Sequence, residues 1–594
     1  MRSSLPTLPR RPAAFCALLI GLAAGPASGQ APGTPVPAPL AGARQVPEAL
    51  NFANGLFRDR RYDLAAEEYE GFLRTTQAGP DADDARFGLA NARLFLGRYK
   101  EARQAFEAFL KAAPKGHPNA STALFRVGET AYLLGDLPAA QASLEKFLAE
   151  NPGHRHEETA WSHAGDVALR LEDLPRARRA YEKVLSKPGG RLAARARLGL
   201  ARVLASQGET EAAVKTLDEL VATGGPEWSD RARYEIGRTE LAAGRLDRAV
   251  SALEGLEKAS PKSPLVPESK LRRAEALGKL DRRDEAEALL KTVSEGSNPN
   301  LAAQAADALG GSLLARGKAA EALATLDEAS SKFAATSLGP LLKFHAAEAA
   351  QALSKLDEAR ARFLKIAESA PDDPLADDAL VRAAGIALEA RDYAAAKTLA
   401  KSLPAKFPRT DRLADAHLIE ARVALVEKDA KGAIALLETA LGPDKPGPAT
   451  AQAATYYLGL AYRADGQSAR ANELLDKLAK TPAASTAAGA QFMLGQGLIE
   501  SGKFAEAIPP LEAYLKGQPE GEVADFALAH LARAQLELGR PDEARATVET
   551  LATKFPKSKA LPAARLGLAE SAMSAKQYDR AAEFFRQAAE SADP

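Results

Sequence analysis

The chain has 594 residues, of which 46% are hydrophobic and 26% are charged, an ordinary composition for a globular protein. Lysine plus arginine and aspartate plus glutamate number 78 each, so the formal net charge is zero. Proteins that coat nucleic acid are normally basic overall or carry a basic segment, so this balance argues against binding to nucleic acid or to a charged membrane surface.

The first segment has the pattern of a secretory signal peptide. Arginines precede an apolar stretch at residues 13–24, and small residues follow that suit cleavage before Gln30. The stretch is too short to span a bilayer comfortably, so we expect residues 1–29 to direct export and to leave no membrane span after cleavage. The alternatives are an uncleaved anchor or an unstructured start. The only cysteine, Cys16, lies inside the stretch, so the mature chain would have no disulfide and no cysteine metal site.

Residues 30–47 are rich in proline, alanine and glycine. Such a segment buries too little apolar surface to fold, so we expect an extended linker. Residues 48–594 then form one continuous array.

A helix–turn–helix pattern repeats fifteen times along this array. We number the corner between the two helices as repeat position 15; one example opens the motif GKFAEA at residues 502–507. Position 20 is always alanine, and position 8 is always glycine or alanine. Closely crossing helices require such small side chains, because overfilling a packed contact costs about 1–3 kcal/mol. The corners are residues 60, 97, 135, 172, 208, 244, 281, 317, 354, 391, 428, 466, 502, 539 and 576, spaced 36 to 38 apart.

Each unit is predicted to contain helix A, a tight corner, helix B and a loop. Positions 20, 24 and 27 place an apolar stripe on one face of helix B, and proline at position 32 often ends that helix. The spacing leaves no room for an inserted domain.

These positions resemble the tetratricopeptide repeat family, which has a small residue at 8, alanine at 20, a large apolar residue at 24 and proline at 32. The resemblance covers residues 48 to about 591. It implies an all-α fold, a right-handed α-solenoid of about fifteen helix pairs with a groove lined by helix A. The period of about 37, rather than the usual 34, looks like that of bacterial periplasmic members. Those include the Tol–Pal-associated cell-division coordinator and the outer-membrane barrel-assembly lipoprotein.

Catalytic motifs are absent from the sequence. The chain has no GxSxG, GxxxxGK[ST] or HExxH pattern, so we expect neither an enzyme nor a cofactor. His154, His156 and His163 gather around one loop between repeats, where they would form either a metal site or a solvated loop pair plus one helix residue. We favour the second interpretation, because His117 occupies the matching loop position one repeat earlier.

The groove is the expected binding site. By the family resemblance, positions 2, 5, 9 and 12 of helix A face it. In the fifth and sixth repeats, arginines at these positions would form one basic stripe that binds an acidic peptide segment or a carboxylate terminus, since arginine binds carboxylates bidentately. The stripe consists of Arg195, Arg202, Arg231 and Arg238, with Tyr234 inside it.

Two alternatives to this groove site stay open. The arginines could belong to a solvated face paired with acids such as Glu235 and Glu240. Phe125 and Tyr132 in the third repeat could anchor partner peptides, or they could simply fill the tight inner curve.

We therefore expect an exported, non-enzymatic scaffold that binds segments of partner proteins in its groove. Its place would be the periplasm or cell envelope, in envelope assembly or division. The alternatives are an accessory subunit or enzyme acting on envelope polymers, and a structural spacer.

Overall fold

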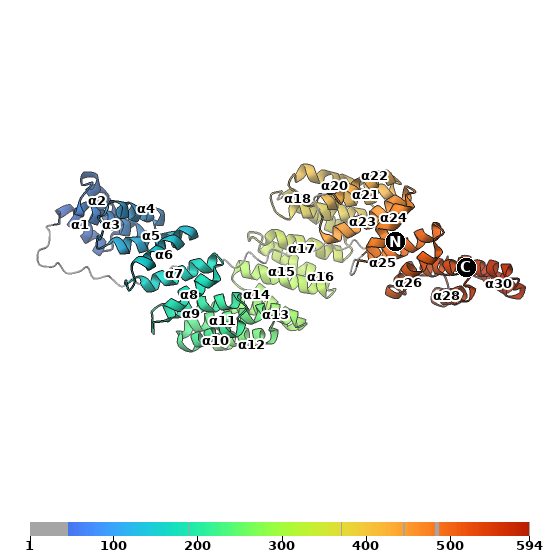
Figure 1. The fold of residues 1–594 in the computed structure, drawn as a ribbon, viewed down its shortest axis with the longest axis horizontal. Helices are drawn as coiled ribbons and strands as arrows, with labels where there is room; N and C mark the ends of the chain where they lie inside the picture. Colours follow the sequence, from blue (N-terminus) through green and yellow to red (C-terminus); the bar gives the residue numbers. More distant parts are fainter. Residues whose placement is uncertain (1–45, 188, 370, 443–445, 482–485, 593–594) are drawn as a thin grey trace. The chain divides into compact units, whose positions relative to one another are not determined.

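The computed structural model describes residues 46–187, 189–369, 371–442, 446–481 and 486–592. These residues form thirty α-helices and no β-strand, which confirms the predicted all-α repeat fold (Figure 1). The predicted signal peptide and most of the predicted linker lie outside the described residues. The chain divides within α15 into two compact units.

The first unit contains α1 to α14 and the start of α15. Its helices are α1 (Glu48–Arg58), α2 (Tyr62–Thr75), α3 (Pro80–Phe95), α4 (Tyr99–Ala112), α5 (Ala120–Leu134), α6 (Leu137–Glu150), α7 (Glu157–Arg170), α8 (Leu174–Leu185), α9 (Ala193–Ser206), α10 (Thr210–Thr223), α11 (Gly225–Ala242), α12 (Leu246–Ala259), α13 (Val266–Lys279), α14 (Arg283–Ser294) and α15 (Pro299–Ala315).

The second unit contains the rest of α15 and the remaining helices. These are α16 (Ala319–Lys332), α17 (Gly339–Ala352), α18 (Leu356–Ser369), α19 (Ala376–Glu389), α20 (Tyr393–Lys406), α21 (Leu413–Val426), α22 (Ala430–Ala440), α23 (Pro448–Ala464), α24 (Ser468–Ala479), α25 (Ala487–Glu500), α26 (Phe504–Gly517), α27 (Ala524–Glu537), α28 (Pro541–Lys554), α29 (Leu561–Ser574) and α30 (Tyr578–Ala592).

Odd-numbered helices are helix A of a repeat, and even-numbered helices are helix B. Within each unit, the extensive contacts join helices that are adjacent or next but one in sequence. Each repeat is therefore stabilised by its immediate neighbours, as in other repeat arrays.

All fifteen predicted corners adopt the left-handed backbone conformation, with φ between 59° and 80°. Eight are glycine and seven are not, although a residue with a Cβ is disfavoured there by about 1–2 kcal/mol. The amide that follows each corner donates to the carbonyl five residues earlier, as Lys503 does to Leu498 at 2.9 Å. This is the closure of a Schellman motif. The backbone therefore defines the corner, and the side chain there is free to vary.

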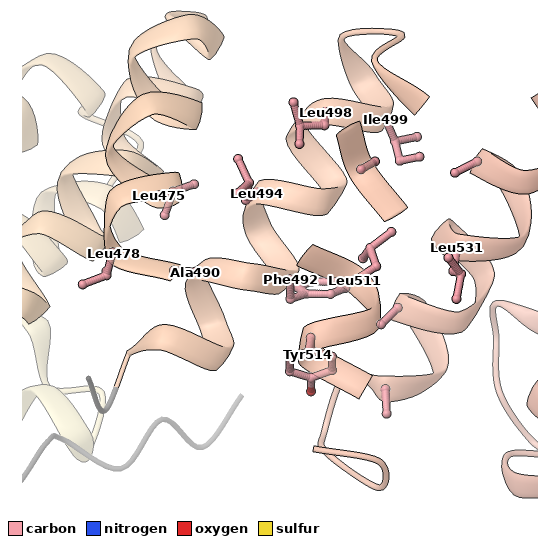
Figure 2. Packing of buried hydrophobic residues seen from close by; sticks show 14 residues of the cluster. Leu475, Leu478, Ala490, Phe492, Leu494, Leu498, Ile499, Leu511, Tyr514 and Leu531 are labelled. Atoms are coloured by element: carbon pink, nitrogen blue, oxygen red, sulfur yellow. The ribbon is translucent and has the colours of Figure 1, made fainter. Parts of the chain in front are cut away.

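The small residue at position 8 is required by the residue at position 24 of the same repeat. A Cβ added at Gly237 would lie 2.4 Å from Leu253 Cγ, and one added at Gly495 would lie 2.5 Å from Leu511 Cγ. The alanines at position 20 are all buried. Figure 2 shows this core around Leu511 of α26, where the ring of Phe492 on α25 lies 5.8 Å from that of Tyr514. The predicted close crossing is confirmed.

Candidate partner-binding site

Tyr181, at position 24 of α8, passes between two glycines. A Cβ at Gly165 of α7 would lie 2.7 Å from its ring, and a Cβ at Gly199 of α9 would lie 2.3 Å from it. The tyrosine is 1% exposed, and its hydroxyl donates to Asp166 Oδ1 at 2.7 Å. The two glycines thus allow a residue of helix B to hold an acid that helix A presents.

Asp166 is the centre of a polar group that joins three consecutive A helices. The Tyr132 hydroxyl of α5 donates to Asp166 Oδ2 at 3.1 Å, and Arg195 Nη2 of α9 donates to the same oxygen. Arg195 Nη2 also donates to the Tyr132 hydroxyl at 3.0 Å. Burial raises the pKa of Tyr132, so its hydroxyl keeps its proton and remains a donor. We call Tyr132, Asp166, Tyr181 and Arg195 the Asp166 cluster; its one cation and one anion cancel.

A second group in the fifth and sixth repeats has an excess of positive charge. Arg202 Nε of α9 donates to Glu235 Oε1 at 3.0 Å, and Arg238 Nη1 of α11 donates to Glu235 Oε2 at 3.2 Å. The carboxylate side chain is 8% exposed, whereas those of Arg202 and Arg238 are 31% and 36% exposed. We call these three residues the Glu235 cluster. Its buried anion fixes two guanidinium groups that still reach solvent.

The other two predicted residues of the stripe have different surroundings. Arg231 pairs with Glu227 at 3.0 Å, but both side chains are exposed, and such pairs contribute little. Tyr234 is buried and donates its hydroxyl to Glu268 Oε1 at 2.6 Å. The four arginines therefore do not form a stripe of unpaired cations, because each of them meets an acid.

The alternative interpretation was that nearby acids pair with the groove arginines. It is right for Glu235 and wrong for Glu240. Glu240 is 3% exposed, and its carboxylate lies 3.8 Å from Arg245 and 3.9 Å from Arg248 rather than beside the groove arginines. Its place at position 11 turns it toward the corner between α11 and α12.

Phe125 is a core residue and offers no exposed anchor. It is 1% exposed, and its ring stacks on His156 with centroids 4.5 Å apart. The interpretation that such aromatics fill the inner curve is the one observed here. Tyr132 is half-buried, with its hydroxyl held in the Asp166 cluster.

The three clustered histidines each pack against an aromatic ring, His154 edge-on and the other two stacked. His154 packs on Phe147, His156 on Phe125 and His163 on Tyr132, with ring centroids 5.3, 4.5 and 4.5 Å apart. Burial lowers the pKa of His156 to about 3, so the expected solvated loop pair is wrong for this residue. Among the described residues, no group of histidines and acids is arranged to hold a metal ion.

The loop histidines help to begin helix A. His154 Nδ1 accepts the backbone N–H of His156 at 3.2 Å. Asp373 and Thr410 accept the N–H two residues on in their own repeats, at 2.8 and 3.0 Å. His117 does the same one repeat earlier, at 3.2 Å. Histidine here takes the place of a short acceptor side chain, which explains why histidine recurs at this loop position.

The sequence-based prediction missed Asp166 and Tyr181. A signal was present: Tyr69 in the first repeat likewise meets a glycine, Gly88, and donates to Asn54 at 2.6 Å. Tyrosine at position 24, glycine at position 6 of the next repeat and an acceptor at position 9 together identify this arrangement.

None of the helices that the structure describes combines the length and the apolar character needed to cross a bilayer.

Comparisons with known families identify the class of protein. A tetratricopeptide repeat family model matches residues 50–117, 89–155, 164–227 and 530–594, and two further models of the same description match residues 453–482 and 498–561. Together these matches span half of the chain. The chain belongs to the tetratricopeptide repeat family, whose fold is a scaffold for binding other proteins or peptides.

Three solved structures with similar folds are distant from this chain in sequence. Yeast Tom70 is 15% identical, with 80% of this chain and 99% of that chain covered and a TM-score of 0.36. The Cut9 and Hcn1 hetero-tetramer of the APC/C gives 16% identity, 82% and 95% coverage and a TM-score of 0.33. A tetratricopeptide repeat protein from Parabacteroides merdae is 20% identical, with 42% of this chain and 93% of that chain covered and a TM-score of 0.33. No curated protein sequence matches. At these values the likeness carries no argument about partners.

Proposed function

We propose that the protein is an exported, non-enzymatic scaffold that binds acidic segments of partner proteins at the Glu235 cluster, in cell-envelope assembly or division. The observation that carries the proposal is the ratio of two partly exposed arginines to one buried carboxylate. The signal-peptide pattern and the long repeat period support the envelope setting.

The geometry favours an anionic ligand. Glu235 already fixes the planes of Arg202 and Arg238, so a partner carboxylate meets guanidinium groups that lose little further side-chain entropy on binding. Arginine presents a fork of donors that suits a carboxylate. The neutral Asp166 cluster beside it joins α5, α7 and α9 but adds no net charge.

The test captures partners inside the cell. A photoreactive phenylalanine derivative replaces the exposed Arg231, and crosslinked peptides are identified by mass spectrometry. The test variant is Arg202→Met/Glu235→Leu/Arg238→Met, which removes the cluster without leaving a buried charge unpaired. We expect acidic peptides on the native surface and at least a tenfold loss of capture in the variant.

A matched control replaces two comparable arginines elsewhere. Arg540 and Arg545 are 50% and 43% exposed and each pairs with an acid, so Arg540→Met/Arg545→Met removes the same two cations from another surface. We expect capture to be unchanged. Unchanged capture in the cluster variant, or crosslinked peptides without excess acid, would contradict the proposal.

A further inference from the structure

The last helix, α30, has one covered face and one uncovered face. Its inner residues Ala581 and Ala588 are buried against the core. Phe585 occupies position 24 of the last repeat and is 40% exposed. The residues at position 24 of the fourteen earlier repeats are each at most 5% exposed. Helix A of the following repeat packs on helix B in those repeats, and no described helix follows α30.

The uncovered face has the spacing of a helix-pairing seam. Tyr578, Ala582, Phe585 and Ala589 are separated by four, three and four residues, the alternation that keeps side chains on one stripe of a paired helix. Tyr578 is 61% exposed, and both alanines are exposed. We call these four residues the outer seam.

We propose that the outer seam binds the outer seam of a second copy of this chain, with the two α30 helices antiparallel. In this register Phe585 faces Ala582 of the second copy, and Tyr578 faces its Ala589. Every layer then combines a large ring with a small side chain. A two-fold axis repeats each contact, as in other self-complementary interfaces.

Charges beside the seam favour the same register. Arg586 is exposed and borders the seam. Antiparallel pairing brings it within two residues of Asp579 and of Glu583 on the second copy, which are acids. Parallel pairing would instead place Phe585 on Phe585, and it would put Arg586 and Asp579 of the second copy on opposite sides of the seam. Charge and side-chain size therefore both select the antiparallel arrangement.

The expected dimer is weak. The seam from residue 578 to residue 589 is only about 16 Å long, and interfaces below about 1,200 Å² are typical of transient complexes. Dimerisation should therefore depend on concentration in the micromolar range.

Sedimentation velocity at chain concentrations from about 1 to about 200 μM tests the association, because a small, transient interface is expected to dissociate on dilution. We expect a monomer–dimer equilibrium that Phe585→Glu weakens at least tenfold, because the two glutamates face alanines of the opposite copy in an apolar seam. Phe526→Glu on α27 is the matched control, since Phe526 is 42% exposed and lies outside the seam. Monomer at every concentration, an unaffected dimer in Phe585→Glu, or equal loss in Phe526→Glu would overturn the proposal.

Disulfide crosslinking tests the register and keeps Phe585 intact. In a Cys16→Ser background, Tyr578→Cys chains are mixed with Ala589→Cys chains and oxidised. We expect the mixed disulfide, while Tyr578→Cys alone stays uncrosslinked because its two copies lie about 16 Å apart along the antiparallel pair. Crosslinking of Tyr578→Cys alone would show parallel pairing and overturn the proposal.

Discussion

At the scale of the residue, position 8 is the most demanding site of each repeat. We expect Gly237→Ala to destabilise the protein by about 1–3 kcal/mol, because the new Cβ would lie 2.4 Å from Leu253 Cγ. Chemical denaturation followed by circular dichroism measures the change.

The control is another glycine within a helix. A Cβ added at Gly278 of α13 meets nothing within 4 Å, so Gly278→Ala should leave stability unchanged or raise it by up to about 1 kcal/mol. A loss of stability in both variants would show that the helical backbone, and not the contact with Leu253, accounts for the glycine.

At the scale of the element, the beginning of α7 depends on an uncharged histidine. Burial lowers the pKa of His154 below its usual value, with the nearby Arg155 adding to the effect. The neutral ring is therefore favoured in the folded state. The stabilising contribution of the neutral ring is complete above pH 6.5, the ordinary pKa of histidine, and it is lost as the pH falls below that value. Protonation also removes the Nδ1 acceptor that meets the N–H of His156.

We expect His154→Thr to remove this pH dependence, since Thr410 makes the same contact before α21 without titrating. A capping contact is worth about 1 kcal/mol, or about a fivefold change in local opening. Amide hydrogen exchange of a peptide covering the start of α7 should show native chain less protected than the variant at pH 5.5 and equally protected at pH 7.5. Equal protection at both pH values would contradict this role.

Elements that recur could be predicted from the sequence, whereas the polar clusters could not. Fifteen copies of one corner and one crossing make their steric cause visible in a single chain. The tyrosine, glycine and acceptor of the Asp166 cluster recur in the first repeat, but the contacts of Asp166 with Tyr132 and Arg195 come from two other repeats and occur once. The arginines of the groove were found by position. Glu235 was considered as a possible partner of these arginines, but its position 6 lies outside the four positions expected to face the groove, so the sequence could not decide between a free basic stripe and paired arginines.

At the scale of the whole molecule, the export proposal predicts a defined mature protein. Mass spectrometry of the periplasmic fraction should find a chain that begins at Gln30, because the small residues before it suit signal peptidase. Replacing Leu18 and Leu19 with lysine interrupts the apolar stretch and should leave the precursor in the cytoplasm. A cytoplasmic native chain that still begins at Met1 would contradict export.

The fifteen left-handed corners also decide how such a chain can change its length. Because backbone hydrogen bonds close each corner whatever residue stands there, an in-phase loss of residues 354–390 would bring Arg391 to the corner that Ser354 occupied. It would remove 37 residues, one helix pair. An out-of-phase loss would place a large side chain at a crossing that admits only glycine or alanine. Gene duplication and deletion can therefore lengthen or shorten the array in whole units, while every remaining core keeps its neighbours.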